Sequence, residues 1–514
     1  MLITVLTVVA RLAGFGRTVV FLHTVGHDRL ADIYNAANTI PNIVFELVAG
    51  GALASLVVPL LAGPVAAGDR DRVNATTSAL LTWMLTLLVP IAILLAVFAG
   101  PIAGLLPHVP PDHQAVAAGM LRVFAPQLPL YGIGIVLTGV LQAHHRFAWP
   151  VIAPLLSSVT VLVAYLSYAV IDGARSDFAG LTTTGRLTLS IGTTVGVVVL
   201  ALCLVVPVRR LGLRLRPRLS FPDDEGRQAV RLGWAGAVTV GSQQIMTLVV
   251  ILLTADNGFA LYVTAQTTFL LPWAVLAVPL ATAVYPTLSA AVSSHDEAAY
   301  ATALAGTARS VVLLAGLGAA ALGGLAAPIA YLVGAAPAAP GIVGFAAGLF
   351  GYALFALLSR ALYARGATVA AAASTAIGWG VAAVTAFGLR LPSQILALGL
   401  AGALGMTVTG VLLVLAVRRY AGPAALHGLG RATAVGIVAA GVAALAGWGV
   451  VVAIGHAFGP TPSGAGSLVQ GMLGGVVVAL AYLAVAYLLD RPDLLPLTDT
   501  VLRRLRRRRG EERT

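Results

Sequence analysis

Long apolar runs separated by short polar or basic turns dominate the sequence. A helix needs about 20 apolar residues to cross a bilayer, and on this basis the pattern predicts fourteen membrane-spanning helices. Several runs exceed the length of a straight span, so we expect them to tilt or to kink at internal prolines (Pro41, Pro126, Pro129, Pro272 and Pro279). The predicted ranges are approximately 2–25, 30–62, 76–106, 114–142, 149–171, 187–208, 228–254, 258–290, 299–334, 340–363, 367–389, 393–418, 432–457 and 466–489.

A basic loop at residues 209–231 separates two groups of six predicted helices, and weak internal similarity indicates that the groups are repeats. Residues 38–63 resemble residues 266–290, with a proline inside each span and a second proline before a short loop. The fourth helix of each group also ends in a basic turn, AHHRFAWP or ALYARGAT. Because both groups start on the same side of the membrane, the repeat is parallel, and two such lobes usually enclose a central cavity.

These patterns together predict an all-α polytopic membrane protein with two six-helix lobes and two additional C-terminal helices. The Arg-rich tail either attracts anionic lipid headgroups or serves only as a topology anchor. The expected parts are an N-terminal lobe at 1–208, a basic linker at 209–227, a C-terminal lobe at 228–420, two further helices at 421–490 and the tail at 491–514.

Composition supports the membrane assignment and narrows the chemistry. The chain is 59% hydrophobic and only 10% charged, with a mean hydropathy of +0.95, whereas soluble domains carry about 25% charged residues. All 31 basic residues are Arg, which excludes a Walker A lysine and a Schiff-base lysine. The single Cys203 excludes a disulfide framework, and the nine His form no HExxH pattern. We therefore expect no catalytic residues, no metal and no cofactor.

The distribution of Arg among the loops predicts the orientation of the chain. Loops on one side, together with the C-terminus, hold 22 Arg, and loops on the opposite side hold four. The positive-inside rule places the Arg-rich side in the cytoplasm, with both termini there. Because the Arg follow this pattern rather than forming a basic domain, nucleic-acid binding is the weakest explanation of the high pI.

A few polar residues interrupt the first two apolar runs. Arg11 and Arg17 lie inside the first run, and a charge at the centre of a bilayer costs at least ~2.5 kcal/mol, so such residues normally face protein or a water-filled cavity. At 100° per residue, the polar residues of the second run share an arc of about 120°. They are Asp32, Asn35, Asn38, Thr39, Asn42 and Glu46.

Two interpretations of the arginines remain open. Arg11 and Arg17 are six residues apart and point about 120° apart, so one partner cannot satisfy both, and a surplus guanidinium suits phosphate or carboxylate. Alternatively, either Arg pairs with Asp32 or Glu46 and holds the helices together. Other polar residues in or near spans either contribute to the site or make interhelical contacts: Gln243, Gln244, Gln266, Arg122, Arg309 and Arg360.

Several of these residues lie in stretches that resemble the MurJ/MviN lipid II flippases, a family within the multidrug/oligosaccharidyl-lipid/polysaccharide exporter superfamily. The stretches are ARLAGFGR (10–17), Asp32, IPN (40–42), AGGALASLVVPLLA (49–62) and HRFAWPVIAP (145–154). The resemblance implies fourteen helices in two lobes, a cationic cavity for the diphosphate and sugar-peptide head of lipid II, and a groove for its lipid tail. It also implies the bacterial cytoplasmic membrane as the location.

The resemblance transfers functional residues only in part. Arg11, Arg17 and Asp32 match family positions, whereas Phe45 and Glu46 stand where the family has basic residues. Gly50 replaces an acid, and Gln266 and Thr267 replace an acid–Arg pair. The acids of the family's sodium site are also missing from 232–254 and 367–389, so we predict no sodium binding.

The hypothesis is therefore a lipid II flippase that works by alternating access and binds its substrate through Arg11, Arg17, Asp32, Asn35, Asn42, Glu46, Gln243 and Gln266. The expected partners are an undecaprenyl-diphosphate-linked substrate, membrane lipids and cell-wall synthesis proteins. Three alternatives remain: a flippase for another polyprenyl-diphosphate-linked glycan, a small-molecule antiporter of the same superfamily, and a non-transporting scaffold for cell-wall assembly.

Overall fold

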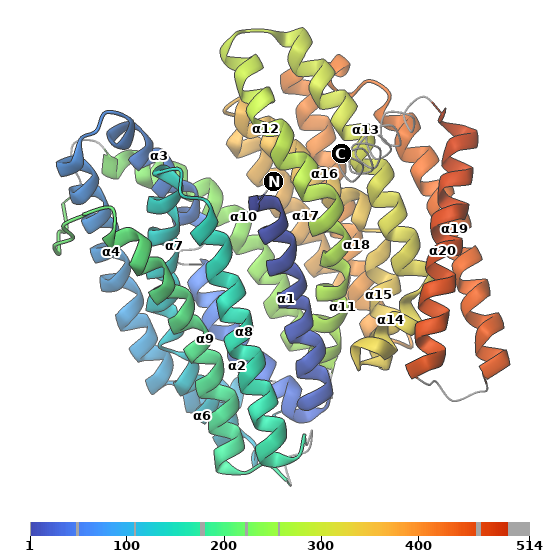
Figure 1. Cartoon of the computed structure of the whole chain (residues 1–514), viewed down its shortest axis with the longest axis horizontal. Coiled ribbons are helices and arrows are strands. Elements are labelled where there is room, and N and C mark those ends of the chain that lie inside the picture. The colour runs from blue at the N-terminus through green and yellow to red at the C-terminus, as the bar shows by residue number, and fades with distance from the viewer. Residues whose placement is uncertain are drawn as a thin grey trace, which may run out of the picture. The chain divides into compact units, whose positions relative to one another are not determined.

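The computed structural model describes residues 2–47, 51–106, 109–174, 180–220, 225–254, 258–458 and 464–491. They belong to two compact units (Figure 1). The first is Met1–Thr264 with Val333–Ala335, and the second is Ala265–Leu332 with Ala336–Thr514. The described residues form helices and no strand, which confirms the all-α class. The predicted tail beyond residue 491 and the substituted Gly50 lie outside the described residues.

The first unit contains ten helices and the start of an eleventh. They are α1 (Leu2–Thr24), α2 (Arg29–Phe45), α3 (Gly51–Ala66), α4 (Arg70–Val97), α5 (Ala99–Leu105), α6 (Gln114–Phe124), α7 (Gln127–Ala143), α8 (Ala148–Asp172), α9 (Thr183–Arg209), α10 (Glu225–Leu253) and α11 (Gly258–Pro272), which ends in the second unit.

The second unit continues from α11 through a π-helical turn at Trp273–Ala277 that follows Pro272. Its helices are α12 (Val278–Ser293), α13 (Glu297–Gly324), α14 (Ala326–Val333), α15 (Ala339–Ala346), α16 (Leu349–Ala364), α17 (Thr368–Gly388), α18 (Gln394–Ala421), α19 (Leu429–Phe458) and α20 (Gly464–Leu489), with short 3-10 turns at Ala336–Ala338 and Pro423–Leu426.

Helices occupy all fourteen predicted ranges, but several ranges contain more than one helix. Within the described residues, ten helices are long and apolar enough to cross a membrane. An eleventh results if Ala336–Ala346 and Leu349–Ala364, which are bent by 57°, form one span. The chain is thus a polytopic membrane protein, and the number of fourteen spans stays a prediction.

The core of the first unit forms where α3, α4, α7 and α9 pack together. Leu61, Leu88, Val140 and Leu204 are fully buried there. α10 packs on α3, so the first compact unit extends past residue 208, where the sequence predicted the first lobe to end.

The second unit is organised around α13 and α18. α13 contacts α12, α16 and α19, whereas α18 contacts α15, α16 and α17. Small residues allow the backbones to approach closely, and a Cβ placed on Gly410 of α18 would lie 2.8 Å from Gly351 Cα of α16. α19 and α20 pack on α13, where the Tyr482 hydroxyl donates to Leu313 O at 2.6 Å. The two C-terminal helices therefore share the core of the second unit.

The two units use the same turn between corresponding helices, α3–α4 and α12–α13. Asp69 N donates to Pro64 O at 3.0 Å, and Asp296 N donates to Ala291 O at 2.9 Å. Each Asp side chain then caps the next helix, by accepting from Arg72 N and Ala299 N respectively. The residue before each Asp adopts a left-handed backbone conformation, with φ 70° at Gly68 and φ 58° at His295.

A second pair of matching turns joins α7 to α8 and α16 to α17. Arg146 N donates to Leu141 O at 2.8 Å, and Ala367 N donates to Leu362 O at 2.9 Å. The preceding residues again adopt positive φ, 57° at His145 and 72° at Gly366. Matching turns at matching places support the predicted parallel repeat.

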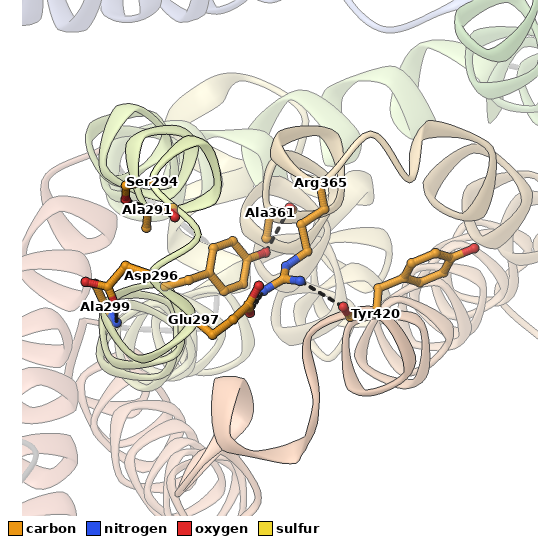
Figure 2. A network of polar contacts seen from close by, with 9 residues as sticks. Ala291, Ser294, Asp296, Glu297, Ala299, Ala361, Arg365 and Tyr420 are labelled. Atoms are coloured by element: carbon orange, nitrogen blue, oxygen red, sulfur yellow. Dashed lines mark hydrogen bonds and ion pairs between the residues drawn. The ribbon is translucent and has the colours of Figure 1, made fainter.

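One charged cluster, here called the Arg365 latch, joins three helices at one end of the second unit. Figure 2 shows the Arg365 guanidinium directed at the Glu297 carboxylate and at the Tyr420 carbonyl, to which Nη1 donates at 3.0 Å. The guanidinium also lies 4.1 Å from the centre of the Tyr300 ring, and the Tyr300 hydroxyl donates to Ala361 O. Burial lowers the pKa of Arg365, but its contacts with Glu297 and Tyr300 outweigh that effect and raise the pKa, so the latch stays charged.

Candidate functional site

The predicted polar face of α2 is present in the structure. The six polar residues from Asp32 to Glu46 are all partly exposed, and most of the intervening apolar residues are buried, except Ile40 and Val44, which are partly exposed. The buried set is Leu30, Ala31, Ile33, Tyr34, Ala36, Ala37, Pro41, Ile43 and Phe45. The helical periodicity therefore places the polar residues of α2 on one face and most of its apolar residues on the other, as predicted.

Asp32 binds the beginning of α11. Its Oδ1 accepts a hydrogen bond from Ala260 N at 2.6 Å. Ala260 is the third residue of α11, and the first N–H groups of a helix lack partners within it. A carboxylate there satisfies one donor and interacts favourably with the positive end of the helix dipole. Asp32 therefore fixes α2 to α11.

Asn38 offers an unused acceptor on the same face. Its Oδ1 is buried and has no hydrogen-bond partner among the described residues. Its backbone carbonyl accepts from Asn42 Nδ2 at 3.1 Å, so the two amides lie one turn apart. A buried acceptor without a partner costs about 1–3 kcal/mol, and a bound hydroxyl or amide donor would remove that cost.

The arginines of α1 have no ionic partner within the described part of the chain. Arg11 is exposed and Arg17 is half-buried, and neither forms a hydrogen bond or an ion pair there. No ion pair joins either Arg to Asp32 or Glu46 among the described residues, so these contacts lend no support to the alternative in which the arginines hold the helices together. Both guanidinium groups keep their donors available.

Tyrosines surround Arg17. It lies close enough to Tyr34, Tyr131 and Tyr165 to interact electrostatically with their hydroxyl groups, and Tyr131 interacts with Glu46 in the same way. Arg17 of α1 and Glu46 at the end of α2 therefore both lie within electrostatic range of Tyr131. This tyrosine was absent from the predicted set.

A buried hydroxyl cluster, also missed by the sequence reasoning, fixes the rotation of α2. The Tyr34 hydroxyl lies 2.9 Å from that of Tyr165 on α8 and 2.5 Å from Thr193 Oγ1 on α9. The rings of Phe21 and Phe124 pack against Tyr34. With Tyr34 held on one side, the polar residues must face the other. A tyrosine on the apolar side of a polar helix is the signal that points to such an anchor.

The two predicted glutamines lie in different units. Gln243 is half-buried on α10, a helix that contacts α2 and α3, and Gln266 is half-buried on α11 within the second unit. Two of the other arginines bond to backbone carbonyls: Arg309 Nη1 to His427 O at 2.9 Å and Arg360 Nη1 to Ala356 O at 2.5 Å. The glutamines remain predicted binding residues; Arg309 joins α13 to a later turn, as the interhelical alternative expects, whereas the bond of Arg360 lies within α16.

The α1–α2 region can bind an anion together with polar groups. It combines two guanidinium groups that have no counter-ion among the described residues with an amide oxygen that has no hydrogen-bond partner there. Among the described residues, no group of three or more His, Cys, Asp or Glu is placed to hold a metal ion.

Comparison with known proteins gives consistent relatives. The sequence model of the family described as "Lipid II flippase MurJ" matches residues 21–471. A protein of Synechocystis sp. named "Probable lipid II flippase MurJ" is 29% identical over 225 residues, 43% of this chain and 41% of that protein. A protein of Rhizobium meliloti with the same name is 27% identical over 294 residues, 55% of this chain and 53% of that protein. These matches span only about half the length of the relatives.

Solved structures share the fold. One titled "Lipid II flippase MurJ, inward closed conformation" has a TM-score of 0.73 at 17% identity and covers 95% of this chain and 98% of that chain. An inward-facing multidrug resistance MATE family transporter has a TM-score of 0.65 at 16% identity, over 81% of this chain and 95% of that one. At these identities the likeness shows the fold alone.

Proposed function

Because the chain belongs to the MurJ family of lipid II flippases, we propose that it transports lipid II across the bacterial cytoplasmic membrane. The substrate is an undecaprenyl-diphosphate-linked peptidoglycan precursor, and the step moves its headgroup from the inner to the outer leaflet with no covalent chemistry. The observation that carries the proposal is the pair of arginines in an apolar helix, Arg11 and Arg17, that have no counter-ion in the described residues.

The diphosphate accounts for both arginines. A guanidinium presents planar, forked donors that match phosphate oxygens, and charge-assisted bonds are about twice as strong as neutral ones. The headgroup also carries sugar and peptide groups, which suit Asn35, Asn38, Asn42 and Glu46 along α2. In this proposal Asp32 positions α2 against α11 through Ala260, and Gln243 and Gln266 contribute further polar contacts.

Transport by alternating access requires the site to open to each side in turn. We propose that both termini are cytoplasmic, in keeping with the Arg distribution. Cell-wall synthesis proteins that supply or consume the precursor are the expected partners.

The direct test is rescue of cells depleted of their essential lipid II flippase, together with flipping of a fluorescent lipid-linked precursor in proteoliposomes. We expect rescue by the wild type and its loss in Arg11→Ala plus Arg17→Ala, with flipping reduced at least about 100-fold from two charge-assisted contacts. The matched control, Arg418→Ala plus Arg419→Ala, removes two exposed arginines from the end of α18. Unchanged flipping in the α1 variant would disprove the assigned roles, and failure of the wild type to flip or rescue would disprove the function.

A further inference from the structure

The segment that follows α9 is an extended strap, defined here as residues 211–220. Gly212, with φ 71°, turns the chain away from the end of α9. Apolar residues then occupy the odd positions Leu213, Leu215, Pro217 and Leu219, and arginines occupy the even positions Arg214, Arg216 and Arg218. In extended chain, alternate residues lie on opposite faces, so the three arginines share one face.

Hydrogen bonds attach the strap to α4 in regular register. The backbone N–H groups of Arg214, Arg216 and Arg218 donate to Asn74 Oδ1, Ser78 Oγ and Thr82 Oγ1 at 3.0, 3.1 and 2.9 Å. Two extended residues rise about 6.6 Å and four helical residues about 6.0 Å, so the two repeats match. One further bond runs from Trp83 Nε1 to Leu219 O at 2.7 Å. The strap therefore packs on the first unit in a defined conformation and is not a flexible linker.

The strap ends where the surface of α4 changes from polar to apolar. The stripe Asn74, Ser78 and Thr82 continues at helical spacing as Leu85, Val89 and Ile93, which are 36%, 39% and 57% exposed. Exposed apolar side chains along a spanning helix face lipid, and Trp is enriched at the boundary between headgroups and hydrocarbon. Trp83, at the end of the strap, is 49% exposed. The strap therefore lies at headgroup level.

The three strap arginines have no counter-ion in the part of the chain that the structure describes. Their side chains are exposed, and within the described residues none forms an ion pair. Arg218 Nε donates to Ser220 Oγ at 3.1 Å. The Leu215 and Leu219 side chains, 40% and 60% exposed, accompany them. Basic and apolar groups are thus displayed together at the depth where phospholipid phosphates lie.

We propose that the strap is a binding site for the phosphate headgroups of anionic phospholipids. The guanidinium groups bind phosphate oxygens, while Trp83, Leu215 and Leu219 enter the boundary between headgroups and acyl chains. The occupant is membrane lipid because the stripe under the strap continues into the lipid-facing surface of α4. This inference goes beyond the proposed transport function, and its test does not require flipping.

The test measures phospholipid occupancy of the purified full chain in detergent by native mass spectrometry, with phosphatidylglycerol and phosphatidylcholine titrated separately. Each arginine near a phosphate surface contributes about fivefold, so Arg214→Gln, Arg216→Gln and Arg218→Gln together should weaken phosphatidylglycerol binding roughly 100-fold. The single variant Arg216→Gln should weaken it about fivefold, which keeps the test decisive if the triple variant misfolds. Phosphatidylcholine binding should not change.

A matched control removes the same charge elsewhere: Arg146→Gln, Arg418→Gln and Arg419→Gln, all exposed and outside the strap and α4. It should remain within about threefold of wild type. Equal losses in the control and strap variants would overturn the proposal by showing a non-specific charge effect. Displacement of phosphatidylglycerol by excess inorganic phosphate would also overturn it, because the site would then prefer a free anion. Unchanged binding in Arg216→Gln would have the same consequence.

Discussion

The two units contain equivalent turns between helices, but different contacts hold the segments next to those helices in place. In the first unit, neutral side chains of α4 bind the backbone of the strap at every second residue. In the second, the charged Arg365 latch joins α13, the end of α16 and the end of α18. The two units therefore share turn geometry and aspartate caps, whereas the contacts that hold the next segment differ between them.

The two kinds of contact differ in their sensitivity to salt. Neutral hydrogen bonds to backbone N–H groups are insensitive to salt, whereas an ion pair is screened as ionic strength rises. Glu297 is 67% exposed and Arg365 is 14% exposed, so solvent screens one side of that pair. The two units should consequently respond differently to the same perturbation.

The largest expected effect comes from removing the polar stripe under the strap. In Asn74→Ala, Ser78→Ala and Thr82→Ala, three hydrogen bonds of about 1 kcal/mol each disappear, so the amides of Arg214, Arg216 and Arg218 should exchange roughly 100-fold faster. Hydrogen–deuterium exchange of the full chain measures this. Thr160→Ala with Thr188→Ala is the control, because these exposed hydroxyls bond only to their own helices. Unaltered exchange would mean that the strap is held by something else.

Breaking the latch should have the next largest effect. Arg365→Ala loses a charge-assisted bond to Tyr420 O, the stacking on Tyr300 and a partly screened ion pair, so we expect about 2 kcal/mol less stability. The stability of Arg365→Lys should fall between those of the wild type and Arg365→Ala, because an ammonium keeps the charge but lacks the planar fork of a guanidinium. Thermal unfolding in detergent reports the change, with the exposed Arg418→Ala as the reference. Equal melting temperatures for Arg365→Ala and the reference would contradict a stabilising latch.

Salt should weaken the ion pair of the Arg365 latch but not the neutral hydrogen bonds that hold the strap. The Debye length falls from about 10 Å at 0.1 M to about 3 Å at 1 M, so the stability difference between wild type and Glu297→Gln, at most about 1 kcal/mol, should shrink. Amide exchange in the strap should not change over the same range. A strap that loosens with salt would show that its arginines, rather than the α4 side chains, attach it.

The smallest effect should come from the left-handed positions. A non-glycine residue there costs about 1–2 kcal/mol, and the added flexibility of glycine in the unfolded chain offsets about 0.5–1 kcal/mol, so His295→Gly should stabilise by about 0.5 kcal/mol. His145→Gly should behave likewise in the first unit. His427→Gly should instead destabilise, because His427 has a φ of −58°. Thermal unfolding compares the three, and destabilisation by all of them would show that the histidine side chains make stabilising contacts.

Apolar run length and helical periodicity predicted much of the fold and one side of the site. They located the helices, the polar face of α2 and the uncompensated arginines of α1. They did not predict that Asp32 binds Ala260 N, because that contact joins residues 228 positions apart through a backbone donor. They also did not predict that α10 packs on α3, because that packing depends on side-chain fit rather than on sequence order.

The strap was predicted only as a basic linker, although its signal is present in the sequence. Arg and apolar residues alternate with period two from Leu213 to Leu219, a pattern typical of a half-buried extended segment. The strap's partners on α4 are spaced i, i+4 and i+8 in the sequence, as Asn74, Ser78 and Thr82.

The strap also has an outer edge that α4 does not cover. Extended chain with a free edge is a template for β-pairing with another polypeptide, and natural proteins block such edges with proline or charge. Pro217 lies at the middle of the strap, at an odd position where an N–H group would point away from α4, and arginines flank it on both sides. The segment is thereby protected against strand addition and self-association, although it remains extended at the protein surface.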